Sequence, residues 1–209
     1  MNFRPLVPIT ATLALFSLAL ISKAAEKQPN ILFIITDQHH ARMMSAAGNP
    51  YLNTPALDSL ANEGTRFTNA YAANPVCVPS RIAMATGMMP GRLGVFDNGM
   101  KAEISELVAT NSLGKLMKAA GYDTFYGGKT HLPPELEPRN AGYDEYFKDQ
   151  REALPAACID FIETPRDRPF FVVASFINPH DICYAFNAYT HAGQRLPLVD
   201  ELYKEASKL

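Results

Sequence analysis

Residues 30–36 read NILFIIT and run directly into Asp37. A short, continuous apolar run is typical of a strand that is buried on both faces of a parallel sheet. A helix is predicted next, from Pro55 to Glu63, because Thr54 is a good N-cap and Gly64 follows the last helical residue. The folded part of the chain therefore opens with a strand and then a helix.

The same order of strand and helix continues along the chain. Further strands are predicted at residues 65–72, 122–126 and 169–176, and further helices at residues 79–87, at 154–163, and from 111 or 112 to 120. This alternation is the pattern of βαβ units, and no internal repeat or linker divides it. A chain of 209 residues that is 47% hydrophobic and 19% charged suits one globular domain. We therefore expect an α/β fold, a mostly parallel sheet with helices on both faces.

Polar side chains follow every predicted strand at its carboxyl end. Asp37 and Gln38 follow the first strand, Cys77 and Arg81 the second, Lys129 and His131 the third, and His180 the fourth. In open α/β sheets, ligands bind in the crevice outside these ends. Each residue alone also has an ordinary interpretation, such as a helix cap for Asp37 or a solvated surface side chain for Lys129. Because all of them lie at one edge of one sheet, a single site explains them better.

These residue types suit the hydrolysis of an ester of a strong oxyacid, which needs a nucleophile, positive groups around the anion and an acid for the leaving oxygen. Asp37 and Gln38 offer hard oxygen ligands for Ca²⁺ or Mg²⁺. Arg81 and Lys129 can surround the anion. Histidine, with an ordinary pKa of about 6.5, is the natural proton donor or acceptor.

Residues 77–81 read Cys-Val-Pro-Ser-Arg and are followed by the pair Thr86-Gly87. If a helix begins at Pro79, an anion beside Cys77 faces the free N–H groups of its first turn. The alternative is an ordinary helix start with a buried free cysteine. The stretch resembles the signature of the formylglycine-dependent sulfatases, Cys-x-Pro-Ser-Arg followed by Thr-Gly.

Three other stretches carry the same resemblance. Residues 128–132, GKTHL, match the family's Gly-Lys-x-His-Leu motif; residues 178–180, NPH, match its Pro-His segment; and residues 141–147, AGYDEYF, resemble a further family stretch. From Asn30 to His180, the chain thus resembles the N-terminal part of a sulfatase of the alkaline-phosphatase-like superfamily.

The resemblance implies a cofactor set. Asp37, Gln38 and Cys77 are the expected metal ligands, with Ca²⁺ as the expected ion and Mg²⁺ or Mn²⁺ as alternatives. Cys77 is expected to be converted to formylglycine by a formylglycine-generating or sulfatase-maturating enzyme. The hydrate of formylglycine then attacks sulfur, and its second hydroxyl lets the sulfated intermediate expel sulfate by elimination.

The resemblance also implies roles for the cations and histidines. Arg81 and Lys129 stabilise the formylglycine and the sulfate, with Lys129 also binding substrate. His131 holds or deprotonates the hydrate, and His180 binds sulfate or protonates the leaving alcohol. The expected function is that of a sulfuric ester hydrolase acting on a sulfated small molecule or saccharide.

Two departures from the family keep other interpretations open. Gln38 stands where many members have a second Asp, a variant that also occurs in branches with relatives acting on phosphonate or phosphate esters, so a phosphodiesterase or phosphonate monoester hydrolase is the alternative function. Family members also run well beyond Leu209 and bring further metal ligands. We therefore expect a C-terminally truncated catalytic domain, or a non-catalytic remnant of the fold. Asn98 and the pair His39-His40 lie near the motifs; a surface-loop role is expected for each, with lining of the pocket as the alternative.

The first residues have the composition of a secretory signal peptide. Arg4 precedes a nearly uncharged run over residues 6–21, and Ser22-Lys23-Ala24 offers small residues for a peptidase. The run is shorter than the roughly 20 residues that span a membrane, although an uncleaved anchor is the alternative. We expect a signal peptide over residues 1–24, a catalytic domain over residues 25–209, a periplasmic or secreted location, and no stable membrane anchor.

Charge and cysteine content limit the partners. Without residues 1–24 the chain has 17 basic and 21 acidic side chains, a formal charge of −4, so nucleic acid is not an expected partner. Cys158 and Cys183 could pair and leave Cys77 free, or both could be unpaired.

Overall fold

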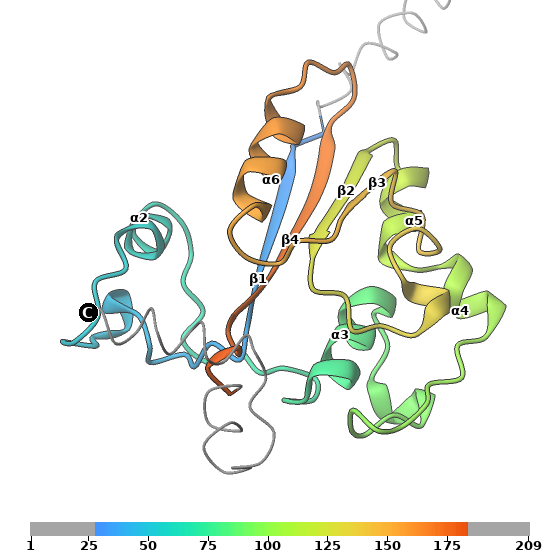
Figure 1. Ribbon diagram of the computed structural model, residues 1–209, viewed down its shortest axis with the longest axis horizontal. Helices are drawn as coiled ribbons and strands as arrows, with labels where there is room; N and C mark the ends of the chain where they lie inside the picture. The colour runs from blue at the N-terminus through green and yellow to red at the C-terminus, as the bar shows by residue number, and fades with distance from the viewer. Residues whose placement is uncertain (1–27, 184–209) are drawn as a thin grey trace, which may run out of the picture.

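The computed structural model describes residues 28–183, which are built around one four-stranded sheet (Figure 1). All three pairings between its strands are parallel, and the strand order is β1-β4-β2-β3. The strands are β1 (Ile31–Asp37), β2 (Asp123–Gly128), β3 (Glu145–Phe147) and β4 (Phe170–Pro179). The predicted parallel α/β sheet is therefore confirmed.

The helices lie between these strands along the chain. They are α2 (Pro55–Glu63), α3 (Cys77–Thr86), α4 (Glu106–Thr110), α5 (Leu113–Ala119) and α6 (Leu154–Glu163), with short 3-10 helices η1 (Ser45–Ala47), η2 (Pro90–Leu93) and η3 (Pro134–Leu136). The bounds of α2 and α6 are those that the sequence predicts.

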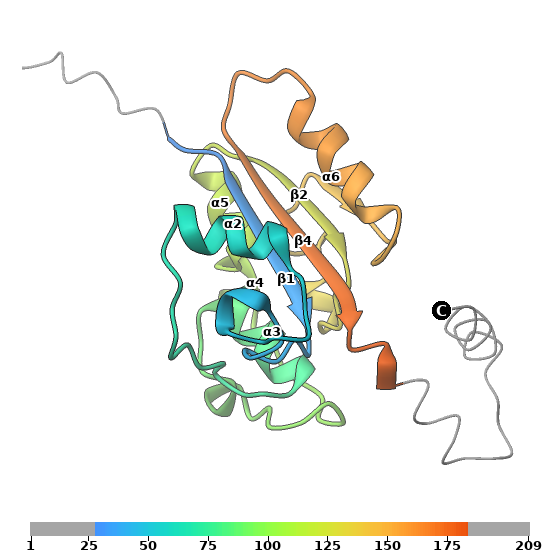
Figure 2. The ribbon, with the colours of Figure 1, turned by 90° about the vertical axis from the view of Figure 1, so that its left-hand side faces the viewer.

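Helices cover both faces of the sheet, as Figure 2 shows for α6 and α5. On one face, Leu154 and Phe161 of α6 pack against Val172 of β4 and its neighbours. On the other face, Leu113 and Met117 of α5 pack against a cluster that contains Tyr122, Tyr126, Phe171 and Val173. Burial of each large apolar side chain contributes about 1.5–3 kcal/mol, so the two layers hold the strands in place. The prediction of helices on both faces is confirmed.

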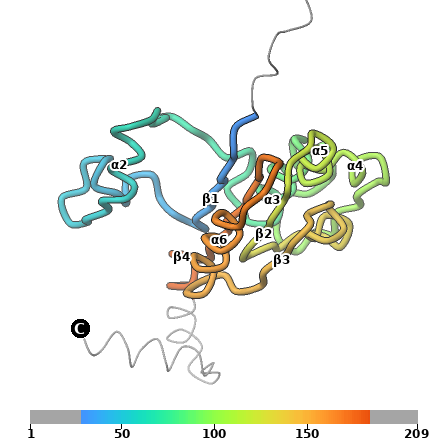
Figure 3. Tube along the Cα trace, turned by 90° about the horizontal axis from the view of Figure 1, so that it is seen from above, coloured from blue at the N-terminus to red at the C-terminus, as the bar shows by residue number. Residues whose placement is uncertain are grey.

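The segment between β1 and α3 contains η1 and α2 and projects away from the sheet (Figures 1 and 3). No residue of α2 is buried. The segment is held together by polar contacts, since Ser45 Oγ donates to Asp58 Oδ2 at 2.7 Å and the Ser45 and Thr54 hydroxyls lie 2.7 Å apart.

The predicted strand at residues 65–72 is wrong, because these residues form turns and coil. Phe67 and Tyr71, the aromatic residues of this stretch, are 78% and 89% exposed. A strand needs a neighbouring strand and a surface to pack against, and within residues 28–183 none lies beside this segment. Cys77 and Arg81 therefore follow a loop, and the third and fourth predicted strands are followed directly by their polar residues. The structure adds the short strand β3, which pairs with β2.

The helix after this loop begins at Cys77, two residues before the predicted start at Pro79. Pro79 is thus the third helical residue, a position whose N–H would have no partner within the helix, so proline costs little there. The helix ends as predicted at Gly87, whose φ of 68° is left-handed and favours glycine.

Other predictions concern cysteines and termini. Cys158 of α6 is buried in the core, and it and Cys183 are free thiols, so they do not pair. The expected signal peptide at residues 1–24 lies outside the described residues. Within residues 28–183, no helix has the length and apolar character needed to cross a membrane.

Candidate active site

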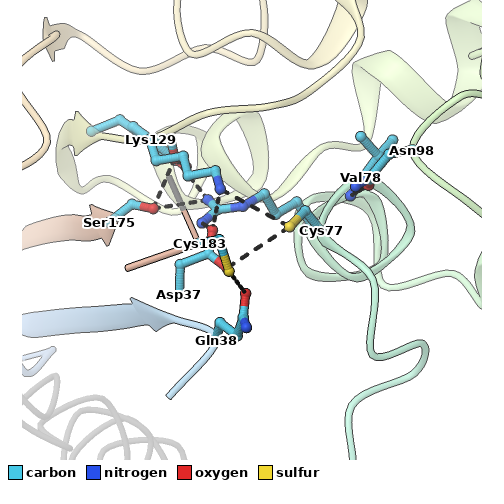
Figure 4. Close-up of polar contacts among 10 residues, drawn as sticks. Asp37, Gln38, Cys77, Val78, Asn98, Lys129, Ser175 and Cys183 are labelled. Carbon is cyan, nitrogen blue, oxygen red and sulfur yellow. Dashed lines mark hydrogen bonds and ion pairs between the residues drawn. The ribbon is translucent and has the colours of Figure 1, made fainter. Parts of the chain in front are cut away.

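The carboxyl ends of β1 and β2 meet the start of α3 in one polar cluster (Figure 4). Asp37 ends β1, Lys129 follows β2, and Cys77 begins α3. The Cys77 Sγ lies 3.8 Å from Asp37 Oδ1 and 4.0 Å from Lys129 Nζ. Lys129 Nζ also forms an ion pair with Asp37 Oδ2. A carboxylate, a thiol and an ammonium group that are distant in sequence are therefore in mutual contact.

The buried side chain of Arg81 holds this cluster together. Its side chain is 4% exposed, and Nη2 donates to Asp37 Oδ2 at 3.1 Å. Its Nη1 donates to the Lys129 carbonyl at 2.7 Å and to Ser175 Oγ at 2.8 Å. The guanidinium of Arg81, which α3 carries, thus links the end of β1 to β4 and to the segment after β2. Its described hydrogen bonds are all made to groups of the protein.

The backbone at Lys129 is fixed by β4. The Lys129 N–H donates to the Ser175 carbonyl at 2.8 Å, and the Lys129 carbonyl accepts from Ser175 Oγ and Tyr126 Oη, each at 2.8 Å. Gly128, just before it, has a φ of 94°, and a Cβ there would lie 2.0 Å from the Ser175 carbonyl oxygen. Only glycine fits this approach, which explains why the lysine of GKTHL is preceded by glycine.

The charges around Asp37 favour its ionised form. Burial alone would raise the pKa of its carboxyl, but the hydrogen bond and charge of Lys129, together with Arg81, outweigh burial and hold the pKa below its ordinary value of 3.8. Asp37 is therefore an anion at neutral pH, and it can bind a cation.

The first turn of α3 offers fewer backbone donors to an anion than the sequence suggested. The Val78 N–H donates to Asn98 Oδ1 at 2.9 Å, Pro79 has no N–H, and the Ser80 N–H donates to the Val76 carbonyl at 3.0 Å. Positive charge near the thiol therefore comes chiefly from side chains and not from this turn.

His180 lies within reach of the same cluster. The backbone N–H of His180 donates to the Asp37 carbonyl at 3.2 Å. One possible ligand atom from each of the side chains of Asp37, Cys77 and His180 lies within 4.8 Å of the other two. These three groups could hold a metal ion. The set shares Asp37 and Cys77 with the predicted ligands, whereas His180 was expected to contact substrate.

The donor atoms of this set suit a hard cation only in part. The Asp37 carboxylate is a ligand that Ca²⁺ and Mg²⁺ prefer, while thiolate and imidazole favour softer ions such as Zn²⁺. Replacing the Cys77 sulfur by oxygen would move the set toward the hard cations. Gln38, the third predicted ligand, is exposed, and its Oε1 accepts from Cys183 Sγ at 3.5 Å.

His131 follows Lys129 by two residues and has a positive φ of 49°. Burial lowers the pKa of its imidazole below the ordinary 6.5, and the charges of Lys129 and Arg81 lower it further. His131 is therefore neutral at pH 7 and can accept a proton.

A cavity of about 570 Å³ opens beside the cluster. Its lining includes Asp37, Gln38, His40, Cys77, Ser80 and Arg81. A volume of this size suits a small organic ligand. Of the two neighbouring histidines, His39 bonds the Met43 carbonyl at 2.7 Å, and His40 accepts from the Arg42 N–H at 3.1 Å.

Sequence reasoning missed Ser175 and expected a surface-loop role for Asn98, with lining of the pocket as the alternative. Ser175 is fully buried and bonds both Arg81 and Lys129. Its signal was a polar residue inside the apolar run of residues 169–176, where a hydroxyl must find a partner. Asn98 carried no such signal, because its partner Val78 is 20 residues away.

Comparison with known proteins gives a consistent family. A protein-family model described as Sulfatase matches residues 29–196. The chain is 38% identical over 141 residues to the N-acetylglucosamine-6-O-sulfatase of Bacteroides thetaiotaomicron, covering 68% of this chain and 24% of that protein. It is 42% identical over 105 residues to an ulvan-active sulfatase of Formosa agariphila, covering 50% of this chain and 20% of that one.

A solved structure shares the fold. A protein crystallised with its substrate D-glucosamine-2-N,6-O-disulfate is 29% identical, with a TM-score of 0.64 over 74% of this chain and 35% of that chain. The chain spans between 20% and 39% of the length of the curated relatives that it matches.

Proposed function

Because the chain belongs to the sulfatase family, we propose that it carries the nucleophile-bearing part of a site that hydrolyses sulfate monoesters. One observation carries the proposal: the Cys77 Sγ lies 3.8 Å from Asp37 Oδ1 and 4.0 Å from Lys129 Nζ. A nucleophile beside an ammonium group is what attack on an anionic ester requires. The proposal concerns the full-length protein.

Cys77 is the proposed precursor of the nucleophile. Converted to formylglycine by a maturating enzyme, residue 77 would supply an aldehyde hydrate that attacks sulfur and then releases sulfate by elimination. The spelling of residues 77–81, with Thr86-Gly87 after it, supports this conversion. The position of Cys77 at the start of α3, beside Asp37, supports its place in the reaction.

The neighbouring side chains divide the remaining work. Lys129 offsets the charge of the bound sulfate, and Arg81 keeps Asp37 and Lys129 in place. His131, whose lowered pKa leaves it neutral, holds the hydrate or accepts its proton. His180, in the same cluster, binds sulfate or protonates the leaving alcohol.

A divalent cation completes the proposed site. Asp37, Gln38 and the oxygen of converted Cys77 would hold Ca²⁺, or Mg²⁺ or Mn²⁺ in its place. When bound, the ion would supply positive charge that stabilises negative charge on the reacting oxygens.

The proposed substrates are sulfated saccharides. Two relatives are named as an N-acetylglucosamine-6-O-sulfatase and an ulvan-active sulfatase, and these names support this class of substrate. The proposed location is periplasmic or secreted, and the composition of residues 1–24 supports export.

Hydrolysis of matched esters tests the proposal. The full-length protein, produced together with a maturating enzyme, is assayed with an aryl sulfate, an aryl phosphate and an aryl phosphonate. We expect the sulfate to be hydrolysed fastest and Cys77→Ala to be inactive. The control Cys158→Ala removes a buried thiol of α6 and should remain active. Faster phosphonate hydrolysis would favour the alternative function, and an active Cys77→Ala variant would exclude Cys77 as the source of the nucleophile.

A further inference from the structure

The start of α3 is capped by a residue from another loop. Val76, the N-cap residue of α3, makes no side-chain capping bond, although helix starts normally depend on one. Asn98 supplies it instead, because its Oδ1 accepts the hydrogen bond of the Val78 N–H at 2.9 Å. Figure 4 shows Asn98 beside Val78, with Cys77 between this contact and Asp37.

The loop that carries Asn98 is itself firmly held. Val95 is fully buried in the same apolar cluster as Val78, beneath α3. Asp97 Oδ1 accepts from the Gly99 N–H at 2.7 Å and from the Met100 N–H at 3.1 Å. Asn98 itself is exposed, but the buried Val95 and the turn bonds of Asp97 restrict the part of the loop that carries it.

A second bond ties this loop to the other side of the cysteine. Asn74 Nδ2 donates to the Phe96 carbonyl at 3.2 Å, and Asn74 Oδ1 accepts from the Val76 N–H at 3.0 Å. Cys77 is thus held by the same loop through the residues on both sides of it.

We propose that Asn98 is a positioning residue that keeps the start of α3, and with it the reactive group of residue 77, in place against Asp37 and Lys129. The inference rests on the proposed function. Asn98 acts through the Val78 N–H and not through substrate. Because a displacement of about 1 Å can reduce a rate by about 100-fold, losing this bond should lower kcat even though Asn98 lies outside the charged cluster.

Steady-state kinetics of the full-length protein test the effect on catalysis, with kcat expressed per mole of converted residue 77 from a mass spectrum. We expect Asn98→Ala to lower kcat about tenfold or more while KM changes less than about twofold. Asn98→Asp keeps the acceptor oxygen and should restore most of kcat. Asn111→Ala removes a side-chain bond at another helix end, in which Nδ2 of Asn111, the C-cap residue of α4, donates to the Leu107 carbonyl, and should leave kcat unchanged.

Three outcomes would overturn the inference: an unchanged kcat in Asn98→Ala, a raised KM with unchanged kcat, which would place Asn98 against substrate, or an aspartate variant as slow as the alanine variant. If Asn98→Ala does not fold, Asn98→Gln, which moves the amide by one methylene, takes its place.

Hydrogen exchange separates this inference from the proposed function. In protein that still has the Cys77 thiol, Asn98→Ala should speed exchange in the peptide over residues 76–84 about tenfold, and Asn111→Ala should not. If the wild-type protein lacks sulfatase activity, the proposed function fails, and exchange still decides whether Asn98 holds the start of α3. Unchanged exchange would refute that hold.

Discussion

Replacing Arg81 by alanine should destabilise the fold by about 3–5 kcal/mol, the cost of removing one partner of a buried ion pair. The guanidinium is 4% exposed and donates hydrogen bonds to Asp37, Lys129 and Ser175. Without it, the Asp37 carboxylate keeps Lys129 but loses its other cation. Asp37 also borders the cavity, where water can reach it, so we expect a value near the lower limit, about 3 kcal/mol.

The free energy of unfolding measures this cost. Urea unfolding of the full-length protein, followed by far-ultraviolet circular dichroism, compares the wild type with Arg81→Ala. The matched control is Arg168→Ala, whose side chain is 59% exposed and pairs with Asp123, because exposed pairs contribute only about 0–1 kcal/mol. Arg81→Lys keeps the charge without the planar fork and should lie between the two. If Arg81→Ala costs no more than Arg168→Ala, then Arg81 does not hold the strand ends together.

Further substitutions test other parts of the account. Gly128→Ala forces a Cβ to within 2.0 Å of the Ser175 carbonyl oxygen, so we expect a loss of stability above about 3 kcal/mol and loss of activity, and normal values for both would contradict the described backbone. Asp144→Asn removes the anion that pairs with Lys118. Burial alone would raise the pKa of Asp144, but its hydrogen bonds to Lys118 and Thr124 hold the pKa below the ordinary 3.8. Because the pair is partly exposed, its contribution is at most about 1 kcal/mol; it is present above pH 3.8 and lost as the pH falls through the lower folded value. Denaturant titrations at pH 7 and pH 3 that show the same deficit would refute this. His131 has a pKa below 6.5 in the folded chain, so wild-type stability should fall as the pH drops below about 6.5, and a His131→Gln variant that kept the same pH dependence would assign it to another group.

The local sequence pattern was sufficient to predict those helices and strands whose own residues mark where they begin and end. The bounds of β1 were predicted within one residue and those of α6 were correct. The predicted burial of β1 on both faces was wrong, because β1 is the edge strand of the described sheet and its Leu32 and Ile34 are 47% and 49% exposed. The prediction of a strand at residues 65–72 was wrong because a strand forms only beside a pairing partner, and the local sequence does not show which segments pair. The strand β3 was missed for the same reason, since its three residues are extended through pairing with β2.

The candidate site was predictable in outline because strand ends define an edge. Asp37 ends β1 and Lys129 directly follows β2, so in a parallel sheet both residues lie at the same edge. The contacts that hold them could not be predicted, because they join residues far apart in the chain. Arg81 reaches Ser175 across 94 residues, and Asn98 reaches Val78 across 20.

The central claim is that Cys77 is the precursor of the nucleophile, and the mass spectrum of its peptide from the native host tests it most directly. The account predicts a peptide lighter than the thiol form, because an aldehyde has replaced the thiol, together with a hydrazine-reactive carbonyl at residue 77. A peptide whose Cys77 is wholly unmodified would contradict it.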